Sequence, residues 1–197
     1  MKLKLEFIAK APKVADDIEV ILINNKSPKN KIVKSINKSL FKNKVFLEKK
    51  LVSINTNDKS YIFVNCLNSK TSLDYEKIGS DLYTFLKNNK IEKSFFEPNL
   101  SNLTSLHLEK LLHGLQLKSY NFNIYKTDKL KNSNVILYIV GKKFKKTNLL
   151  RDKLNSLLEG VFLTRDLVSE PGNVLHPDEY AKRITKLRKL GLKVTVY

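Results

Sequence analysis

The chain is poor in the residues that build covalent or special backbone structures. Its 197 residues include one cysteine, one methionine, six glycines, five prolines and no tryptophan. A single cysteine, Cys66, excludes an internal disulfide framework and is typical of a reducing compartment. No apolar run approaches the roughly 18 residues that span a bilayer, and residues 1–17 alternate lysine with apolar residues instead of forming a signal-peptide core. We therefore expect a cytoplasmic protein with no membrane partner.

Acidic residues and arginine are also scarce. Lysine and arginine number 37 against 19 aspartates and glutamates, and the net charge is +18. Lysine supplies nearly all of the positive charge, with modest clusters at Lys29–Lys44 and Gly141–Lys146. A/T-rich codons raise lysine and asparagine together, whereas a phosphate-binding surface concentrates charge on one face and uses arginine for bidentate contacts. The charge therefore indicates a solvated exterior with nonspecific, salt-sensitive DNA binding. A lysine-rich nucleic-acid-binding module is the alternative.

Apolar patterns predict strands that alternate with helices over most of the chain. The hydrophobic fraction of 42% suffices for an ordinary core. Period-two patterns and short apolar runs predict strands, at Lys2–Ile8, Asp17–Asn24, Lys59–Leu67, Ile91–Glu97 and Asn134–Gly141. Helical spacing predicts helices at Lys29–Lys42, Ser72–Asn88 and Leu103–Leu117, and Tyr120–Tyr125 is predicted to be extended. The fold class expected from this alternation is α/β, with helices flanking a mixed or mainly parallel sheet.

The last quarter of the chain has a different pattern, typical of a connection between domains. From Asn148, apolar residues form one helical stripe of about 20 residues, or ~30 Å, and the helix should stop at Glu170 because that residue precedes Pro171. Gly172 suits a sharp reversal. Start signals for a new helix follow, with His176 at the N-cap, Pro177 at the first position and a predicted end near Leu190.

After this second helix, Gly191 is a stop signal and Leu192–Tyr197 is predicted to begin a strand. These boundaries divide the chain into three parts. Residues 1–147 are an N-terminal domain, 148–176 a linker helix and junction, and 177–197 the beginning of a second α/β domain.

The junction resembles a known family. Its sequence GVFLTRDLVSEPGNVLHPDEYA, residues 160–181, is similar to the junction of the leucyl (cytosol) aminopeptidases, the M17 metallopeptidases. Members carry in the same order a helix rich in small residues, Arg-Asp-Leu, Pro-x-Asn and Thr-Pro before a Tyr/Phe-Ala helix. His113–Asp128 and YIFVNCLN, residues 61–68, look like further family segments. Asn65 and Cys66 stand where the family has glycine, and His176 replaces a Thr or Ser, which weakens the N-cap.

The resemblance implies a function for a longer protein. The family's N-terminal domain has a macro-domain-like fold and helps to build a hexamer. Its C-terminal domain removes N-terminal residues from peptides with a water activated by two divalent ions, manganese, zinc or magnesium. The metal ligands lie in an Asn-Thr-Asp-Ala-Glu-Gly-Arg signature and nearby segments, and none of these motifs occurs in residues 1–197. We therefore predict a non-catalytic, oligomer-building portion of a leucyl aminopeptidase that is inactive alone, with no catalytic, metal-binding or cofactor-binding residue in this chain.

Residues of catalytic type in the chain are better explained by structural roles. His107 and His113 are six apart on a predicted helix, roughly 240° around the axis, so we expect opposite faces and surface or cap roles. Cys66 is expected to be a small buried hydrophobe. Arg165 and Asp166 are expected to lock the linker helix to its neighbours. The paired carboxylates are expected to be strand-edge or helix-start charges, and they are Asp16, Asp17, Asp74 and Glu76. The serines Ser80 and Ser169 have no catalytic-triad context.

One further alternative rests on fold analogy alone. A free-standing macro-like domain could bind ADP-ribose, which would make the chain a ligand-binding module and not part of an enzyme.

Overall fold

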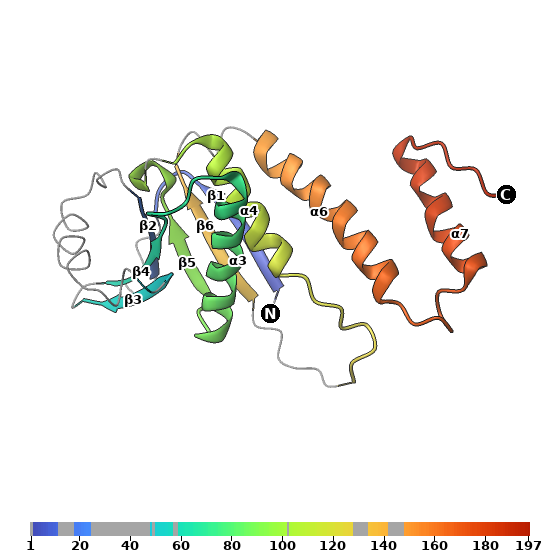
Figure 1. Cartoon of the computed structure of the whole chain (residues 1–197), viewed down its shortest axis with the longest axis horizontal. Coiled ribbons are helices and arrows are strands. Elements are labelled where there is room, and N and C mark those ends of the chain that lie inside the picture. Colours follow the sequence, from blue (N-terminus) through green and yellow to red (C-terminus); the bar gives the residue numbers. More distant parts are fainter. Residues whose placement is uncertain are drawn as a thin grey trace.

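The computed structural model describes residues 2–11, 18–24, 48, 50–56, 59–101, 103–127, 134–141 and 148–197. Within these ranges the chain is a mixed α/β protein with helices packed on a six-stranded sheet (Figure 1). The predicted helix at Lys29–Lys42, the Lys29–Lys44 cluster, Asp16–Asp17 and all but the first residue of the Gly141–Lys146 cluster lie outside the described residues.

The sheet confirms the expected mixed, mainly parallel arrangement. Its strand order is β1-β6-β5-β2-β4-β3, and every neighbouring pair is parallel except β3 with β4. The strands are β1 Lys2–Ile8, β2 Ile18–Ile23, β3 Leu51–Asn55, β4 Ser60–Asn65, β5 Lys93–Phe96 and β6 Asn134–Val140. Strand β3 was not predicted. It is a five-residue edge strand whose side chains are only partly buried, so its apolar pattern is short and weak.

Two helices cover one face of the sheet and cross each other at glycines. They are α3, Ser72–Asn88, and α4, Ser105–Lys118, joined through β5 and a short 3-10 turn, η1, Pro98–Ser101. Thr71 and Asp74 form a capping box at the start of α3. At the crossing, a Cβ placed on Gly79 would lie 1.9 Å from the Leu111 carbonyl oxygen, and one on Gly114 would lie 1.8 Å from that of Glu76. The two helix backbones are therefore in direct contact.

The core has a larger and a smaller part, on opposite faces of the sheet. The larger part joins the sheet to α3, α4 and the start of α6, and it includes Ile62, Leu82, Leu86, Leu108, Leu111, Leu112, Leu115, Leu137 and Leu154. The smaller part contains Ile21, Ile23, Tyr61 and Phe63. Strands β2 and β4 contribute to both, because successive side chains alternate between faces. This explains why their sequences read as nearly continuous apolar runs.

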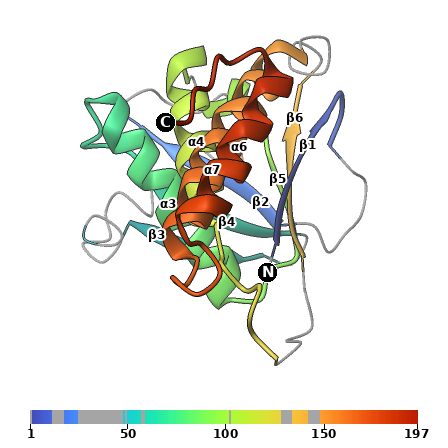
Figure 2. The same ribbon diagram turned by 90° about the vertical axis from the view of Figure 1, so that its right-hand side faces the viewer.

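A long helix leaves this body and carries the chain to a separate helix. Helix α6, Asn148–Ser169, runs beside α4, and α7, Pro177–Thr185, returns along it on the outer side (Figures 1 and 2). A 3-10 turn, η2, Lys186–Leu190, follows α7 and ends at Gly191, which has a left-handed φ of 83°. The predicted bounds of α6 are confirmed within one turn, and α7 starts at Pro177 as predicted but ends at Thr185, with the 3-10 turn η2 covering the rest of the predicted helix to Leu190. None of the helices in the described ranges is both long and apolar enough to cross a membrane.

The strand predicted at Leu192–Tyr197 is wrong. The segment has no regular structure, and the Arg188 side chain donates to the Val194 carbonyl at 2.6 Å. A strand needs a neighbouring strand for its hydrogen bonds, and no strand of the described part pairs with this segment.

Candidate functional site

The carboxyl half of α6 is fastened to the chain that follows α4. Arg165 donates from Nη1 to the Leu117 carbonyl at 2.7 Å, and the Tyr120 hydroxyl donates to Asp166 Oδ1 at 2.8 Å. The Tyr120 ring packs against Phe162, and the Arg165 guanidinium lies 5.4 Å from the ring centroid. Burial and the bond to Asp166 raise the pKa of Tyr120. The predicted locking role of Arg165 and Asp166 is therefore confirmed.

A second network ties α7 to the end of α6. The Glu170 carboxylate accepts from Arg183 Nη1 at 2.8 Å and, in a short hydrogen bond, from the Tyr125 hydroxyl. Arg183 Nε also donates to Glu179 at 3.1 Å, one turn earlier on α7. The Glu170 side chain is only 5% exposed. We call Tyr125, Glu170 and Arg183 the junction network.

Mutual hydrogen bonding shifts the titration of each member of this network. The bonds from Tyr125 and Arg183 hold the pKa of Glu170 below its usual value. The same bonds raise the pKa values of Tyr125 and Arg183. The network therefore consists of a carboxylate, a guanidinium and a neutral phenol over a wide pH range.

Sequence reasoning missed the junction network. It treated Glu170 only as the residue at which α6 stops. Its partners lie 45 and 13 residues away, so no local spacing rule pairs them. The available signal was a glutamate before a proline, followed by an arginine in the last turn of the next helix, and this pattern is too common to single out.

The turn between α6 and α7 forms without special help from glycine. Val174 and Leu175 both donate their backbone N–H to the Pro171 carbonyl at 2.9 Å. Gly172 has no positive φ, and a Cβ there would meet nothing within 4 Å. The turn therefore does not use the conformational freedom that makes Gly172 suited to a sharp reversal, because Pro171 and the carbonyl bonds turn the chain.

Helix α7 begins as predicted. His176 is the N-cap and makes no side-chain cap bond, Pro177 is the first helical residue, and Asp178 and Glu179 occupy the first turn. The loss of a hydroxyl N-cap expected from His176 is thus confirmed.

Helix α7 buries none of its residues, although it has distinct apolar and charged faces. Large apolar side chains are exposed on α6, on α7 and beyond it: Leu157, Val168, Tyr180, Leu190, Leu192 and Val196. Leu190 is 77% exposed and Val168 82%. An amphipathic helix normally buries its apolar face, so the described part of the chain leaves this surface uncovered.

The two histidines of α4 both contact helix α3. His107 stacks on Tyr75, with ring centroids 4.1 Å apart, and His113 Nδ1 lies 3.4 Å from Glu76 Oε2. The prediction of opposite faces is wrong: both rings face α3, because its close crossing brings Tyr75 and Glu76 within reach of both. Neither ring nitrogen of His113 makes a hydrogen bond. In the described ranges, His, Cys, Asp and Glu do not gather in groups of three that could hold a metal ion.

The other residues of catalytic type have local roles. Cys66 is buried, and burial raises its pKa to about 12. Asp74 accepts the backbone N–H groups of Thr71 and Lys70, bonds that lower its pKa. Ser80 lies on α3, and Ser169 ends α6 beside the Tyr120 hydroxyl.

Known proteins similar to this chain are aminopeptidases. The chain is 40% identical over 85 residues to a probable cytosol aminopeptidase of Gluconobacter oxydans, covering 42% of this chain and 17% of that protein. It is 29% identical over 168 residues to the probable cytosol aminopeptidase of Treponema denticola, covering 81% of this chain and 35% of that protein. No family model matches the chain.

Solved structures agree in fold. A mutant of tomato leucine aminopeptidase matches with a TM-score of 0.69 at 15% identity, over 96% of this chain and 43% of that one. The bottromycin maturation enzyme BotP in complex with Mn matches with a TM-score of 0.64 at 16% identity, over 93% of this chain and 38% of that one. At such identities the likeness concerns the fold.

These matches confirm the resemblance to the leucyl aminopeptidases and the α/β fold expected from it. The matched part amounts to between about a sixth and about a third of the length of the two curated relatives. Neither the nucleic-acid-binding module nor the ADP-ribose-binding domain is favoured by the comparisons.

Proposed function

We propose that this chain is the N-terminal, non-catalytic portion of a cytoplasmic leucyl aminopeptidase. Residues 1–147 form the N-terminal domain, 148–176 the linker helix and junction, and 177–197 the beginning of the catalytic domain. The observation that carries the proposal is helix α7, which is amphipathic, is held in place by the junction network and buries no residue. A catalytic domain continuing from residue 197 would cover its apolar face.

The longer enzyme would release N-terminal amino acids from peptides. Two divalent metal ions, manganese, zinc or magnesium, would supply an activated water and stabilise the tetrahedral intermediate. The manganese in the BotP structure supports this choice by fold analogy. We assign no metal ligand to residues 1–197, because the motifs that carry the family's ligands do not occur in this sequence.

The contribution of this portion to the enzyme would be structural. It would help to build the hexamer and shape the access of peptides to active sites in the catalytic domain. Its rich core and the helix-to-helix locks around Arg165 and Glu170 suit a scaffold that must hold a second domain in a set direction.

The proposal is tested by reading the gene beyond the codon for Tyr197 and by expressing what it encodes. We expect an open frame that continues through the Asn-Thr-Asp-Ala-Glu-Gly-Arg signature. The full product should cleave leucine p-nitroanilide with added Mn²⁺, and it should lose this activity with a chelator. Purified residues 1–197 should not cleave the substrate. A stop codon directly after Tyr197, or metal-dependent cleavage by residues 1–197 alone, would contradict the proposal.

A further inference from the structure

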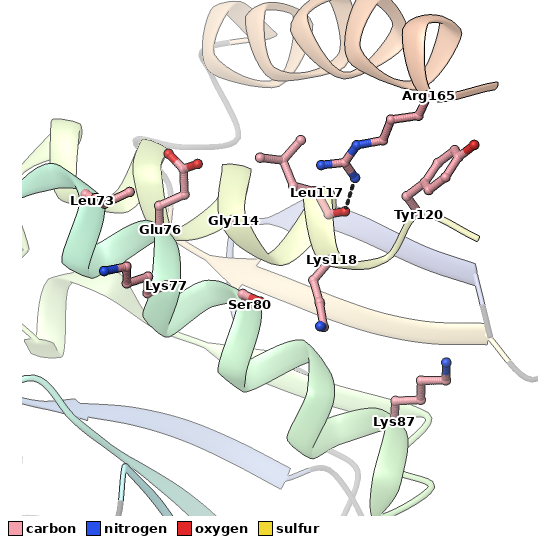
Figure 3. A pocket seen from close by; sticks show the side chains of 10 residues that line it. All are labelled: Leu73, Glu76, Lys77, Ser80, Lys87, Gly114, Leu117, Lys118, Tyr120 and Arg165. Carbon is pink, nitrogen blue, oxygen red and sulfur yellow. Dashed lines mark hydrogen bonds between the residues drawn. The ribbon is translucent and has the colours of Figure 1, made fainter. Parts of the chain in front are cut away.

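A groove runs between the helices that cover the sheet, away from the junction network. It lies over the crossing of α3 and α4 and ends at Arg165 of α6, with a volume of about 540 Å³. Gly114, Leu73 and Leu117 give it an apolar floor, and Figure 3 shows cationic side chains around that floor. We call it the basic groove, lined by Leu73, Glu76, Lys77, Ser80, Lys87, Gly114, Leu117, Lys118, Tyr120 and Arg165.

Three lysines of the basic groove make no close ion pair within the described part of the chain, although Lys77 is near enough to Asp74 to help lower the pKa of that carboxyl. Lys77, Lys87 and Lys118 are exposed and form no ion pair or hydrogen bond with the described residues. Other lysines do find partners: Lys50 lies 2.8 Å from Asp81, and Lys153 lies 2.8 Å from Glu109. Other exposed lysines, Lys182 and Lys189 among them, also form no ion pair with the described residues, so Lys77, Lys87 and Lys118 are distinguished by lining the same groove.

The single acid of the basic groove does not neutralise these lysines. Glu76 lies 3.4 Å from His113 Nδ1 and 3.9 Å from Lys110 Nζ. Its carboxylate points away from Lys87 and Lys118 (Figure 3). A cluster of like charges around a partly apolar floor attracts an anionic ligand and repels a cationic one.

The remaining side chains of the groove favour carboxylates over nucleic acid. Tyr120 packs against Phe162 and lies 5.4 Å from the Arg165 guanidinium, so its ring is already engaged in contacts within the protein and is a poor platform for stacking a base. Arg165 already donates from Nη1 to the Leu117 carbonyl and lies against the Tyr120 ring, so only part of its guanidinium is left for a phosphate. Each lysine ammonium group acts as a point charge, so three separate lysines suit the separate carboxylates of flexible acidic side chains.

We propose that the basic groove binds an acidic polypeptide segment of a partner protein, one rich in glutamate. The carboxylates would pair with Lys77, Lys87 and Lys118, and the glutamate methylene groups would lie on Leu73 and Leu117. This interaction does not depend on the aminopeptidase proposal, since it uses only α3, α4 and the start of the following segment.

The test is the binding of a labelled polyglutamate peptide to residues 1–197, measured by fluorescence anisotropy at about 150 mM ionic strength. The triple variant K77Q/K87Q/K118Q should bind about tenfold more weakly, as expected for three exposed ion pairs. The matched control is K182Q/K189Q/K193Q, which removes the same charge from exposed positions on α7 and after it. The control should bind like the unchanged protein.

Three outcomes would overturn the proposal. Equal loss in both triple variants would reduce the binding to net charge. Displacement of the peptide by equally charged single-stranded DNA at lower concentration, with the same dependence on the three groove lysines, would assign the groove to nucleic acid.

The single variant K118E provides a second measurement if the triple variant unfolds. Lys118 is exposed and lies on the last turn of α4. The K118E change should weaken polyglutamate binding, and unchanged binding would also overturn the proposal.

Discussion

Burial sets the chemistry of individual residues in this chain, and Cys66 is the plainest case. Its side chain is 2% exposed and sits in the larger part of the core, at the end of β4. A thiolate is costly in such surroundings, so the pKa is raised to about 12. The thiol is therefore a packing group and not a nucleophile.

We expect Cys66 to resist thiol reagents while the protein is folded. With a pKa near 12, almost no thiolate exists at pH 8, and the sulfur is shielded from the reagent. Ellman's reagent should react slowly in buffer and fully in guanidinium chloride. Rapid reaction of the native protein, with its circular dichroism unchanged, would refute a buried thiol.

The N-cap of α7 is a second position where one residue sets a local property. His176 makes no side-chain bond to the first turn. An aspartate there could accept a backbone N–H and would face the positive end of the helix dipole, so H176D should stabilise α7 by about 1 kcal/mol. Hydrogen exchange of the α7 amides should slow by about fivefold. Unchanged hydrogen-exchange protection of the α7 amides would show that the backbone around Pro177 prevents a side-chain cap.

At the scale of elements, the crossing of α3 and α4 depends on two glycines. An alanine at Gly79 or Gly114 would place its Cβ within 2 Å of a backbone carbonyl oxygen of the other helix. Backbone cannot move aside as a side chain can, so the helices would have to separate and loosen the core between them.

We expect G79A to lower the free energy of unfolding by about 3 kcal/mol, measured by urea denaturation with an unchanged m-value. The matched control is G160A on α6, where a Cβ meets nothing within 4 Å. That change should raise the free energy by about 0.5–1 kcal/mol, because alanine is the better helix former. Similar effects at the two sites would argue against a backbone-to-backbone crossing.

At the scale of the whole molecule, the junction network holds α7 against the end of α6 and the segment after α4. Glu170 receives hydrogen bonds from two different segments, Tyr125 after α4 and Arg183 on α7. The folded-state pKa of Glu170 lies below its usual value. Its stabilising contribution is therefore complete above the unfolded pKa of about 4.3 and is lost as the pH falls through the folded-state pKa.

We expect E170Q to loosen the junction at neutral pH. Glutamine cannot pair ionically with Arg183, so limited proteolysis between Pro171 and His176 should become several-fold faster. The control E159Q changes an exposed glutamate of α6 and should cleave like the unchanged protein. In the unchanged protein, amide exchange of α7 should rise below about pH 4, whereas in E170Q it should show no such acid step. An identical acid step in both would place the titrating group elsewhere.

Much of the fold was predictable because its signals are local. Helix α3 begins and ends where its apolar spacing and first-turn acids indicate, and α6 ends at Ser169, one residue before the predicted stop at Glu170. The edge strand β3 could not be predicted from the sequence, because an edge strand buries little apolar surface and its apolar pattern is weak. The strand predicted at Leu192–Tyr197 failed because a strand exists only with a partner, which apolar alternation cannot reveal.

The amino-acid sequence by itself determined the alternation of strands and helices, the stop at Pro171, the start at Pro177 and the resemblance to the leucyl aminopeptidases. Each of these depends on residues near one another in the chain. Only the tertiary structure decided that Glu170 meets Tyr125 and Arg183, that Gly79 and Gly114 bring two helices into backbone contact, and that three unpaired lysines line one groove. These features join residues far apart in the chain. Such contacts depend on how the helices and strands pack, which no local sequence pattern specifies.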